Sequence, residues 1–346
     1  MDKKVRIGLI GVGNIAQNAH IPAYLKQKDV ELVACYDIKA ERAKEVAAKY
    51  GMTAEDSLEA LVARDDLDAV SVCTWNNGHA QATIAALKAG KHVLCEKPMA
   101  MNPAECEAMI AAQKESGKLL MMGFVYRFSA SAKAIKAMTD EGRFGNIYHA
   151  RAGILRRRGT PLGWFTDLSK SGGGPVIDIG VHVIDLTWYL MGKPKPVSVC
   201  AQVHNRIGDY KTKGVSRWEA LDKDNLVFET EDSAAGIVKF ENDVSMIFEV
   251  SWAINGQEEG VTAKIYGDKA GASYNPCKIY GEEAGYLSDN DINAGREDNF
   301  YNEIRHFIDC IKGDAQCIAT GEDGLVVQKI LNGIYQSSAE KREIIL

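Results

Sequence analysis

The chain has 346 residues, of which 46% are hydrophobic and 25% charged, with a formal net charge of -6 and a pI near 5.7. These values are ordinary for a globular protein and exclude a disordered, collagen-like or coiled-coil chain. The length exceeds one typical core, so we expect two domains. The acidic balance gives no general attraction to nucleic acid or to an anionic membrane, and we expect neither as a partner.

The eight cysteines show no C-x-x-C pair and no metal-ligand spacing, so we expect structural thiols and no metal site. The apolar segment near the N-terminus is short, is interrupted by Gly8, Gly11 and Gly13, and differs from a signal peptide. No segment approaches the roughly 20 apolar residues of a membrane span. We therefore expect a cytoplasmic protein.

From residue 5 to about 123, short apolar segments alternate with amphipathic ones. Strand-like examples are "VRIGLI", "VELVACY" and "AVSVC", and helix-like examples are "ERAKEVAAKYG" and "HAQATIAALKAG". Continuous apolar strands separated by helices are typical of a parallel sheet covered on both faces. We predict an α/β Rossmann domain over residues 1–123.

After residue 124 the pattern changes to longer strands with a period of two, such as "SVCAQVHNRI", "AAGIVKFEN", "VSMIFEVSWAI" and "VTAKIYG". Turn-forming pairs join them, including Asn242-Asp243 and Gly267-Asp268. Strands that follow one another so closely favour antiparallel pairing. We predict an α+β domain over residues 124–346, with a large, mainly antiparallel, open-faced sheet and helices on one face.

A G-x-G-x-x-A element runs from Gly11 to Ala16, directly after the first predicted strand and before the first predicted helix. A glycine-rich turn without a ligand is the simpler interpretation of such an element. The second strand, however, ends in an acid about 20 residues further on, where a carboxylate binds the adenosine ribose of a dinucleotide. That acid would repel a 2′-phosphate and favours NAD over NADP. We expect the dinucleotide to contact Gly11, Gly13, Asn14, Ile15 and Asp37.

Two later strands of this domain are followed by polar residues. Because ligands of open α/β sheets bind at the carboxyl ends of strands, we expect these residues to contact the cofactor. For single residues, a helix cap at Asn76 or an exposed lysine in a loop remains an alternative. We expect cofactor contacts from Thr74, Trp75, Asn76, His79, Glu96 and Lys97.

The second domain contains the segment "SGGGPVIDIGVHVIDLTWYLMG". A helix that begins near Val176 places Asp178 and His182 four residues apart on one face, with Asp185 on roughly the same side. An ion pair on a solvated face is one alternative. A metal site is disfavoured because no further ligand has suitable spacing. A histidine beside an acid is also the arrangement that general acid/base catalysis needs.

Together these motifs resemble those of the Gfo/Idh/MocA oxidoreductase family, which includes glucose-fructose oxidoreductase and inositol dehydrogenases. The resemblance covers essentially the whole chain. It rests on the G-x-G-x-x-A element, on Glu96-Lys97-Pro98, and on "GFVYRF", "GGGPVIDIGVHVID" and "TGEDGLVVQKILNGIYQSS". One departure is Trp75-Asn76-Asn77, where many members have a proline after the threonine.

The resemblance implies a Rossmann domain, an open-faced sheet that often forms the interface of a homodimer or homotetramer, and a catalytic set matching Lys97, Asp178 and His182. It implies transfer of a hydride between a secondary alcohol of a sugar or cyclitol and nicotinamide. We expect His182 to act as base and Lys97 to stabilise the oxyanion. Tyr126 and Arg127 are expected to contact the substrate. An NAD-dependent glycosidase that uses transient oxidation and a non-catalytic dinucleotide-binding regulator are the alternatives.

Overall fold

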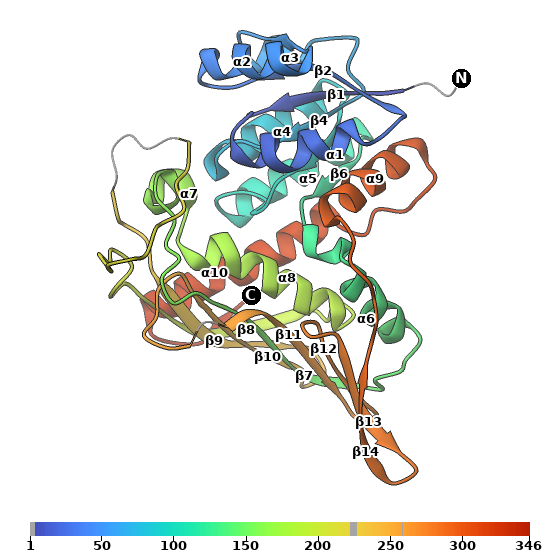
Figure 1. Cartoon of the computed structure of the whole chain (residues 1–346), viewed down its shortest axis with the longest axis vertical. Coiled ribbons are helices and arrows are strands. Elements are labelled where there is room, and N and C mark those ends of the chain that lie inside the picture. The colour runs from blue at the N-terminus through green and yellow to red at the C-terminus, as the bar shows by residue number, and fades with distance from the viewer. Residues whose placement is uncertain (1–3, 222–226, 258) are drawn as a thin grey trace. The chain divides into compact units, whose positions relative to one another are not determined.

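The computed structural model describes residues 4–221, 227–257 and 259–346, and its elements are shown in Figure 1. Its contacts divide the chain into two compact units. The first unit consists of Met1–Phe124 and Asp298–Gln328, and the second of Val125–Glu297 and Lys329–Leu346. Residues 298–328 thus pack with the N-terminal residues, a grouping that the sequence-based division at 123/124 does not contain.

The first unit is built on a six-stranded parallel sheet. In spatial order its strands are β3 (Thr53–Ala54), β2 (Val30–Tyr36), β1 (Val5–Ile10), β4 (Ala69–Val72), β5 (His92–Cys95) and β6 (Leu120–Met122). The central strands are almost entirely buried, because helices cover both faces of the sheet. This is the doubly wound order that places a ligand where β1 and β4 diverge, and it confirms the predicted Rossmann fold.

The helices of this unit are the π-helix η1 (Ala16–His20), α1 (Ile21–Leu25), α2 (Ala40–Tyr50), α3 (Leu58–Val62), the 3-10 helix η2 (Asn76–Gly78), α4 (His79–Lys88), α5 (Pro103–Ser116) and α9 (Asn299–Lys312). Local sequence explains their ends. In α5, for example, the Asn102 side chain accepts a hydrogen bond from the backbone N–H of Glu105, Pro103 occupies the first turn, and Gly117 ends the helix at φ 66°.

The second unit contains a nine-stranded sheet. In spatial order its strands are β14 (Tyr286–Asp291), β13 (Lys278–Glu283), β12 (Gly271–Ser273), β11 (Glu259–Gly267), β7 (Ile147–Leu155), β10 (Ser245–Ser251), β9 (Ser233–Phe240), β8 (Pro196–His204) and β15 (Ile344–Ile345). Among the described strands of this sheet, only β7 and β10 pair in parallel. The predicted mainly antiparallel sheet is therefore confirmed, and Asn242 and Asp243 form the β9/β10 turn with φ 63° and 59°.

The helices of the second unit are the 3-10 helices η3 (Val125–Phe128) and η4 (Trp164–Thr166), α6 (Ala130–Asp140), α7 (Leu168–Ser171), the π-helix η5 (Val176–Gly180) and α8 (Val181–Leu190). α10 (Gly321–Glu340) continues from the first unit into the second. α8 packs on β7 and β11 and covers one face of the nine-stranded sheet (Figure 1). No helix of the described residues combines the length and apolarity needed to cross a bilayer.

Candidate active site

The glycine turn after β1 combines one position that the protein's own packing restricts with one that it leaves open. Gly11 has φ 85°, and a Cβ there would lie 2.7 Å from the carbonyl oxygen of Cys73, so only glycine fits. A Cβ on Gly13 would meet no protein atom within 4 Å. The turn therefore fits a dinucleotide, whose pyrophosphate needs open space at the second glycine. Asn14 and Ile15 directly precede η1, and both are half-buried.

Asp37 follows β2 and closes the same turn. Its Oδ2 accepts a hydrogen bond from the N–H of Val12 at 2.9 Å, and its Oδ1 accepts one from the N–H of Lys39 at 2.9 Å. Arg42 Nη1 lies 3.5 Å from Oδ1. A carboxylate oxygen can accept two hydrogen bonds, so Oδ2 retains capacity for a ribose hydroxyl. Backbone N–H groups of the glycine turn and of the segment after β2 thus fix the orientation of the Asp37 carboxylate.

The segment after β4 carries Thr74, Trp75 and Asn76, with His79 beginning α4. His79 is buried, and its Nδ1 lies 2.7 Å from the carbonyl oxygen of Pro98, while Nε2 lies 3.2 Å from that of Thr74. Burial lowers the pKa of His79, which favours a neutral ring. A neutral ring donates one hydrogen bond, and the shorter contact assigns it to Pro98. The His79 ring therefore links this loop to the one after β5.

The loop after β5 explains why Glu96, Lys97 and Pro98 follow a buried strand. Glu96 Oε1 lies 2.8 Å from His20 Nε2, and Oε2 accepts a hydrogen bond from the N–H of Lys97 at 3.1 Å. Burial would raise the pKa of Glu96, but the hydrogen bond and charge of His20 and the charge of Lys97 hold it below its usual value. The Lys97–Pro98 bond is cis, and Lys97 is half-buried. Glu96 thus holds the backbone that carries Lys97.

Beneath this loop lies a second acid that sequence reasoning missed. Glu303 of α9 is completely buried, and neither carboxylate oxygen has a hydrogen-bond partner among the described residues. Burial, with the charge of Glu96 as a second cause, raises the pKa of Glu303 well above its usual value. A neutral acid therefore lies near the ionised Glu96, an arrangement typical of two nearby carboxyls.

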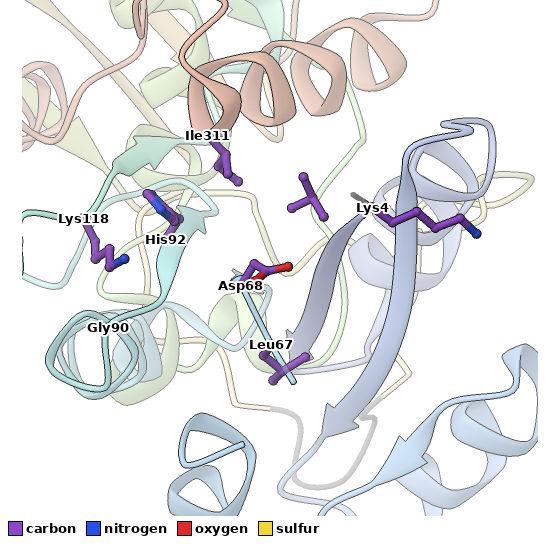
Figure 2. A pocket seen from close by; sticks show the side chains of 8 residues that line it. Lys4, Leu67, Asp68, Gly90, His92, Lys118 and Ile311 are labelled. Carbon is purple, nitrogen blue, oxygen red and sulfur yellow. The ribbon is translucent and has the colours of Figure 1, made fainter. Parts of the chain in front are cut away.

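A hollow of about 270 Å³ opens elsewhere on the first unit (Figure 2). It is lined by Lys4, Val5, Leu67, Asp68, Gly90, His92, Lys118 and Ile311. Several of these residues precede or begin β1, β4 and β5, so the hollow lies at the amino ends of the strands. Ligands of such sheets bind at the carboxyl ends. The hollow is therefore separate from the residues predicted to bind the cofactor.

In the second unit, η5 and α8 form one continuous buried segment with two accessible positions. Every residue from Val176 to Leu190 is buried except Asp178 and His182, which are half-exposed. They are four positions apart, so both side chains reach the same side of the segment. On a segment otherwise buried, these two polar side chains are the ones with accessible surface.

Two residues distant in sequence hold this segment in place. Trp252, directly after β10 and fully buried, donates a hydrogen bond from Nε1 to Asp178 Oδ2 at 3.0 Å. Glu231 accepts hydrogen bonds from the backbone N–H groups of Gly174 and Val176 at 2.9 and 3.1 Å, and from Tyr335 Oη at 2.8 Å. Sequence reasoning missed both residues, because nothing local marks them.

Tyr126 and Arg127 were both predicted to contact substrate, but the structure separates them. Tyr126 is half-buried, and its ring centroid lies 5.0 Å from that of His182. Arg127 has no exposed surface, and its Nε lies 3.0 Å from Asp185 Oδ2. Tyr126 thus lies beside His182, whereas Arg127 forms a buried ion pair. Asp185, expected on the side of Asp178 and His182, is instead buried against this guanidinium.

Two domain models of one protein family match consecutive parts of this chain. Residues 5–124 match the model described as "Oxidoreductase family, NAD-binding Rossmann fold", and residues 132–273 match "GFO/IDH/MocA C-terminal domain". The chain is 35% identical over 340 residues to D-glucoside 3-dehydrogenase of Escherichia coli (strain K12), which covers 96% of this chain and 95% of that protein. It is 27% identical over 344 residues to inositol 2-dehydrogenase of Rhizobium meliloti (strain 1021), covering 98% of each. The crystal structure of an oxidoreductase domain protein from Kribbella flavida aligns with a TM-score of 0.86 at 27% identity, over 99% of both chains.

Proposed function

This chain belongs to the GFO/IDH/MocA family of oxidoreductases, and on that premise we propose that it is an NAD-dependent dehydrogenase acting on a secondary hydroxyl of a sugar or cyclitol. The relatives named above act on a glucoside and on inositol, both ring compounds with adjacent secondary hydroxyls. Those names do not favour the NAD-dependent glycosidase or the non-catalytic regulator.

The observation that carries this proposal is the pair of accessible polar side chains on the buried η5/α8 segment. Asp178 and His182 are half-exposed where their neighbours are packed, and the Trp252 indole orients Asp178. A regulator that only binds a dinucleotide needs no such pair. A dehydrogenase needs it, because oxidation of an alcohol requires a base for the hydroxyl proton.

We assign each group one step of the reaction. His182 accepts the hydroxyl proton while the carbon–oxygen bond becomes a carbonyl, and the Lys97 ammonium stabilises the negative charge on that oxygen. Asp178 hydrogen-bonds either the His182 ring or a neighbouring hydroxyl. NAD held by the glycine turn and Asp37 would supply the acceptor for the hydride that leaves the same carbon. One proton and one hydride leave the alcohol, so the reaction is balanced without another reactant.

The preference for NAD over NADP is proposed from the surroundings of Asp37. Its carboxylate is buried and held by two backbone N–H groups, so a 2′-phosphate placed there would meet a desolvated negative charge. Arg42 lies beside it and reduces this repulsion. We therefore expect a preference for NAD that is finite, measured as the ratio of kcat/KM for the two cofactors.

The test of the catalytic assignment is His182→Ala. Because general base catalysis contributes roughly 10²–10⁴-fold, kcat should fall by that factor while the Kd for NAD stays unchanged. His149→Ala is a matched control, since His149 is also half-buried in the second unit but lies on β7 and contacts Ser245. Turnover of His182→Ala close to that of wild type would refute the role of His182.

The substrate class is tested by following the absorbance of reduced nicotinamide with a panel of glucosides, aldoses, amino sugars and inositols. Reduction of NAD with one of these supports the proposal and ranks the substrates. Release of a free sugar from a glycoside with no net NAD reduction would instead establish the glycosidase. NAD binding with neither outcome would establish the regulator.

We further propose that the enzyme works as a homo-oligomer through the uncovered face of the nine-stranded sheet. On that face the register aligns Ile247 of β10 with Ile237 of β9 and Arg151 of β7, and Ile247 is 44% exposed. Exposed apolar side chains on a broad sheet favour association. Ile247→Glu should shift the mass measured by light scattering towards the monomer. An unchanged mass would contradict this use of the face.

A further inference from the structure

The first unit brings together one histidine and two cysteines that the proposed dehydrogenase reaction does not use. His306 and Cys310 lie in the last turns of α9, and Cys317 lies in the segment that follows it. Their ligand atoms, one nitrogen and two sulfurs, all lie within 4.8 Å of one another. Among the described residues, this is the place where three side chains of the metal-ligating types meet so closely. All three are half-exposed, so an ion can reach them from solvent.

The sequence spacing explains both the cluster and why the sequence analysis missed it. His306 and Cys310 are four residues apart on a helix, so they share one face. The chain then turns at Gly313, whose φ is 83°, and returns Cys317 to the same face. The resulting pattern, H-x₃-C-x₆-C, has no C-x-x-C element and depends on the geometry of that turn.

The distance between His306 and Cys310 matches that of a tetrahedral metal site. Zinc bonds of about 2.3 Å to sulfur and about 2.0 Å to nitrogen, at tetrahedral angles, place the two ligand atoms about 3.5 Å apart. Cys310 Sγ lies 3.4 Å from His306 Nε2. The two ligands on α9 can therefore bind one ion with little movement of that helix. His306 Nε2 now accepts a hydrogen bond from the N–H of Ile318 at 3.2 Å, and the ion would take over that lone pair.

The electrostatic surroundings also suit a cation. The carbonyl end of α9 carries a partial negative charge, which favours a cation near its last turn. The basic side chains of α9 at Arg305 and Lys312 both pair with Asp29.

We propose that His306, Cys310 and Cys317 bind one thiophilic divalent cation of the zinc class, with solvent as the fourth ligand. Thiolate and imidazole together select such ions over magnesium or calcium. The ion would join α9 to the segment before α10. In that segment the carbonyl oxygen of Ala319 accepts a hydrogen bond from the N–H of Met122, at the end of β6, at 2.8 Å. The site therefore stabilises the edge of the parallel sheet and takes no part in hydride transfer.

The test titrates the reduced full-length enzyme with cobalt(II) under anaerobic conditions and then displaces the cobalt with zinc. We expect one equivalent of cobalt, with thiolate-to-cobalt charge-transfer absorption, and a rise in Tm when zinc binds. Cys310→Ser, Cys317→Ser and His306→Gln should each weaken binding by more than the roughly 10–100-fold that loss of an outer partner costs. Cys277→Ser is the matched control, because that thiol is also half-exposed but lies outside the cluster, and it should bind as wild type does.

A second measurement needs no variant and so does not depend on folding of the mutants. Zinc should slow alkylation of Cys310 and Cys317 in the wild-type enzyme, while alkylation of Cys277 proceeds at the same rate, as judged by peptide mass mapping. Absence of the charge-transfer band, equal binding by the cluster variants, or unprotected alkylation would overturn the proposal. A Cys310–Cys317 disulfide formed with peroxide in protein that binds no metal would identify a redox pair instead. The dehydrogenase proposal is measured separately, as activity without added metal. Failure of the metal-site proposal therefore leaves the dehydrogenase proposal standing, and the reverse also holds.

Discussion

Arg127→Met tests whether the buried guanidinium supports the fold or the substrate. Arg127 and Asp185 are 0% and 2% exposed, and the guanidinium also lies 4.7 Å from the centre of the Tyr189 ring. Removing one partner of such a pair leaves an uncompensated buried charge, which costs about 3–5 kcal/mol. At about 2–4 °C per kcal/mol for a domain of this size, Tm should fall by roughly 6–20 °C.

The second half of this prediction is the double variant Arg127→Met/Asp185→Leu. Replacing a buried ion pair by apolar side chains of similar volume is often neutral, so the double variant should recover most of the lost stability. Thermal and urea unfolding measure both variants, and Arg143→Met, at an exposed arginine, is the control. An unchanged Tm for Arg127→Met together with a raised KM for substrate would refute the reasoning and return Arg127 to the substrate site.

Three further perturbations follow from contacts described above. Gly13→Ala should leave Tm unchanged, because its Cβ meets no protein atom, but should raise the Kd for NAD in a calorimetric titration; Gly11→Ala should lower Tm, because its Cβ would lie 2.7 Å from a backbone oxygen. If Gly13→Ala binds NAD as wild type does, the open space does not receive the cofactor. Trp252→Phe removes the hydrogen bond from the indole to Asp178. A hydrogen bond to a charged group contributes about 1.5–3 kcal/mol. We therefore expect kcat to fall at least about ten-fold, with the Kd for NAD unchanged. A change in Tm alone would mean that the indole only packs. Burial raises the pKa of Glu303 in the folded protein above its unfolded-state value of about 4.3. Its contribution to the free energy of unfolding is therefore complete below the unfolded-state pKa and is lost as the pH rises through the folded-state pKa. Glu303→Gln should therefore gain stability over wild type in urea unfolding as pH increases from 5 towards 8, and a pH-independent difference would contradict the neutral acid.

Sequence determined the nucleotide half of this protein because its signals are local. Apolar strands, the glycine turn and Asp37 lie within one short stretch, and each reflects a backbone or charge requirement that neighbouring residues express. The same holds for Asn242-Asp243, whose turn conformation follows from the tolerance of these residues for positive φ. The sequence likewise predicted that Asp178 and His182 share one face, because residues four positions apart lie on the same side of a helix.

Tertiary structure decided which polar side chains are available and which are used internally. Arg127 meets Asp185 58 residues away, Trp252 meets Asp178 74 residues away, and Glu231 meets Gly174 57 residues away. A side chain's partner depends on which elements pack together, and the sequence near each residue carries no signal of that packing. For the same reason an arginine beside a tyrosine looked like a ligand contact and became a buried ion pair. Residues 298–328 show this on a larger scale, since they follow the second sheet in sequence but pack with the first unit.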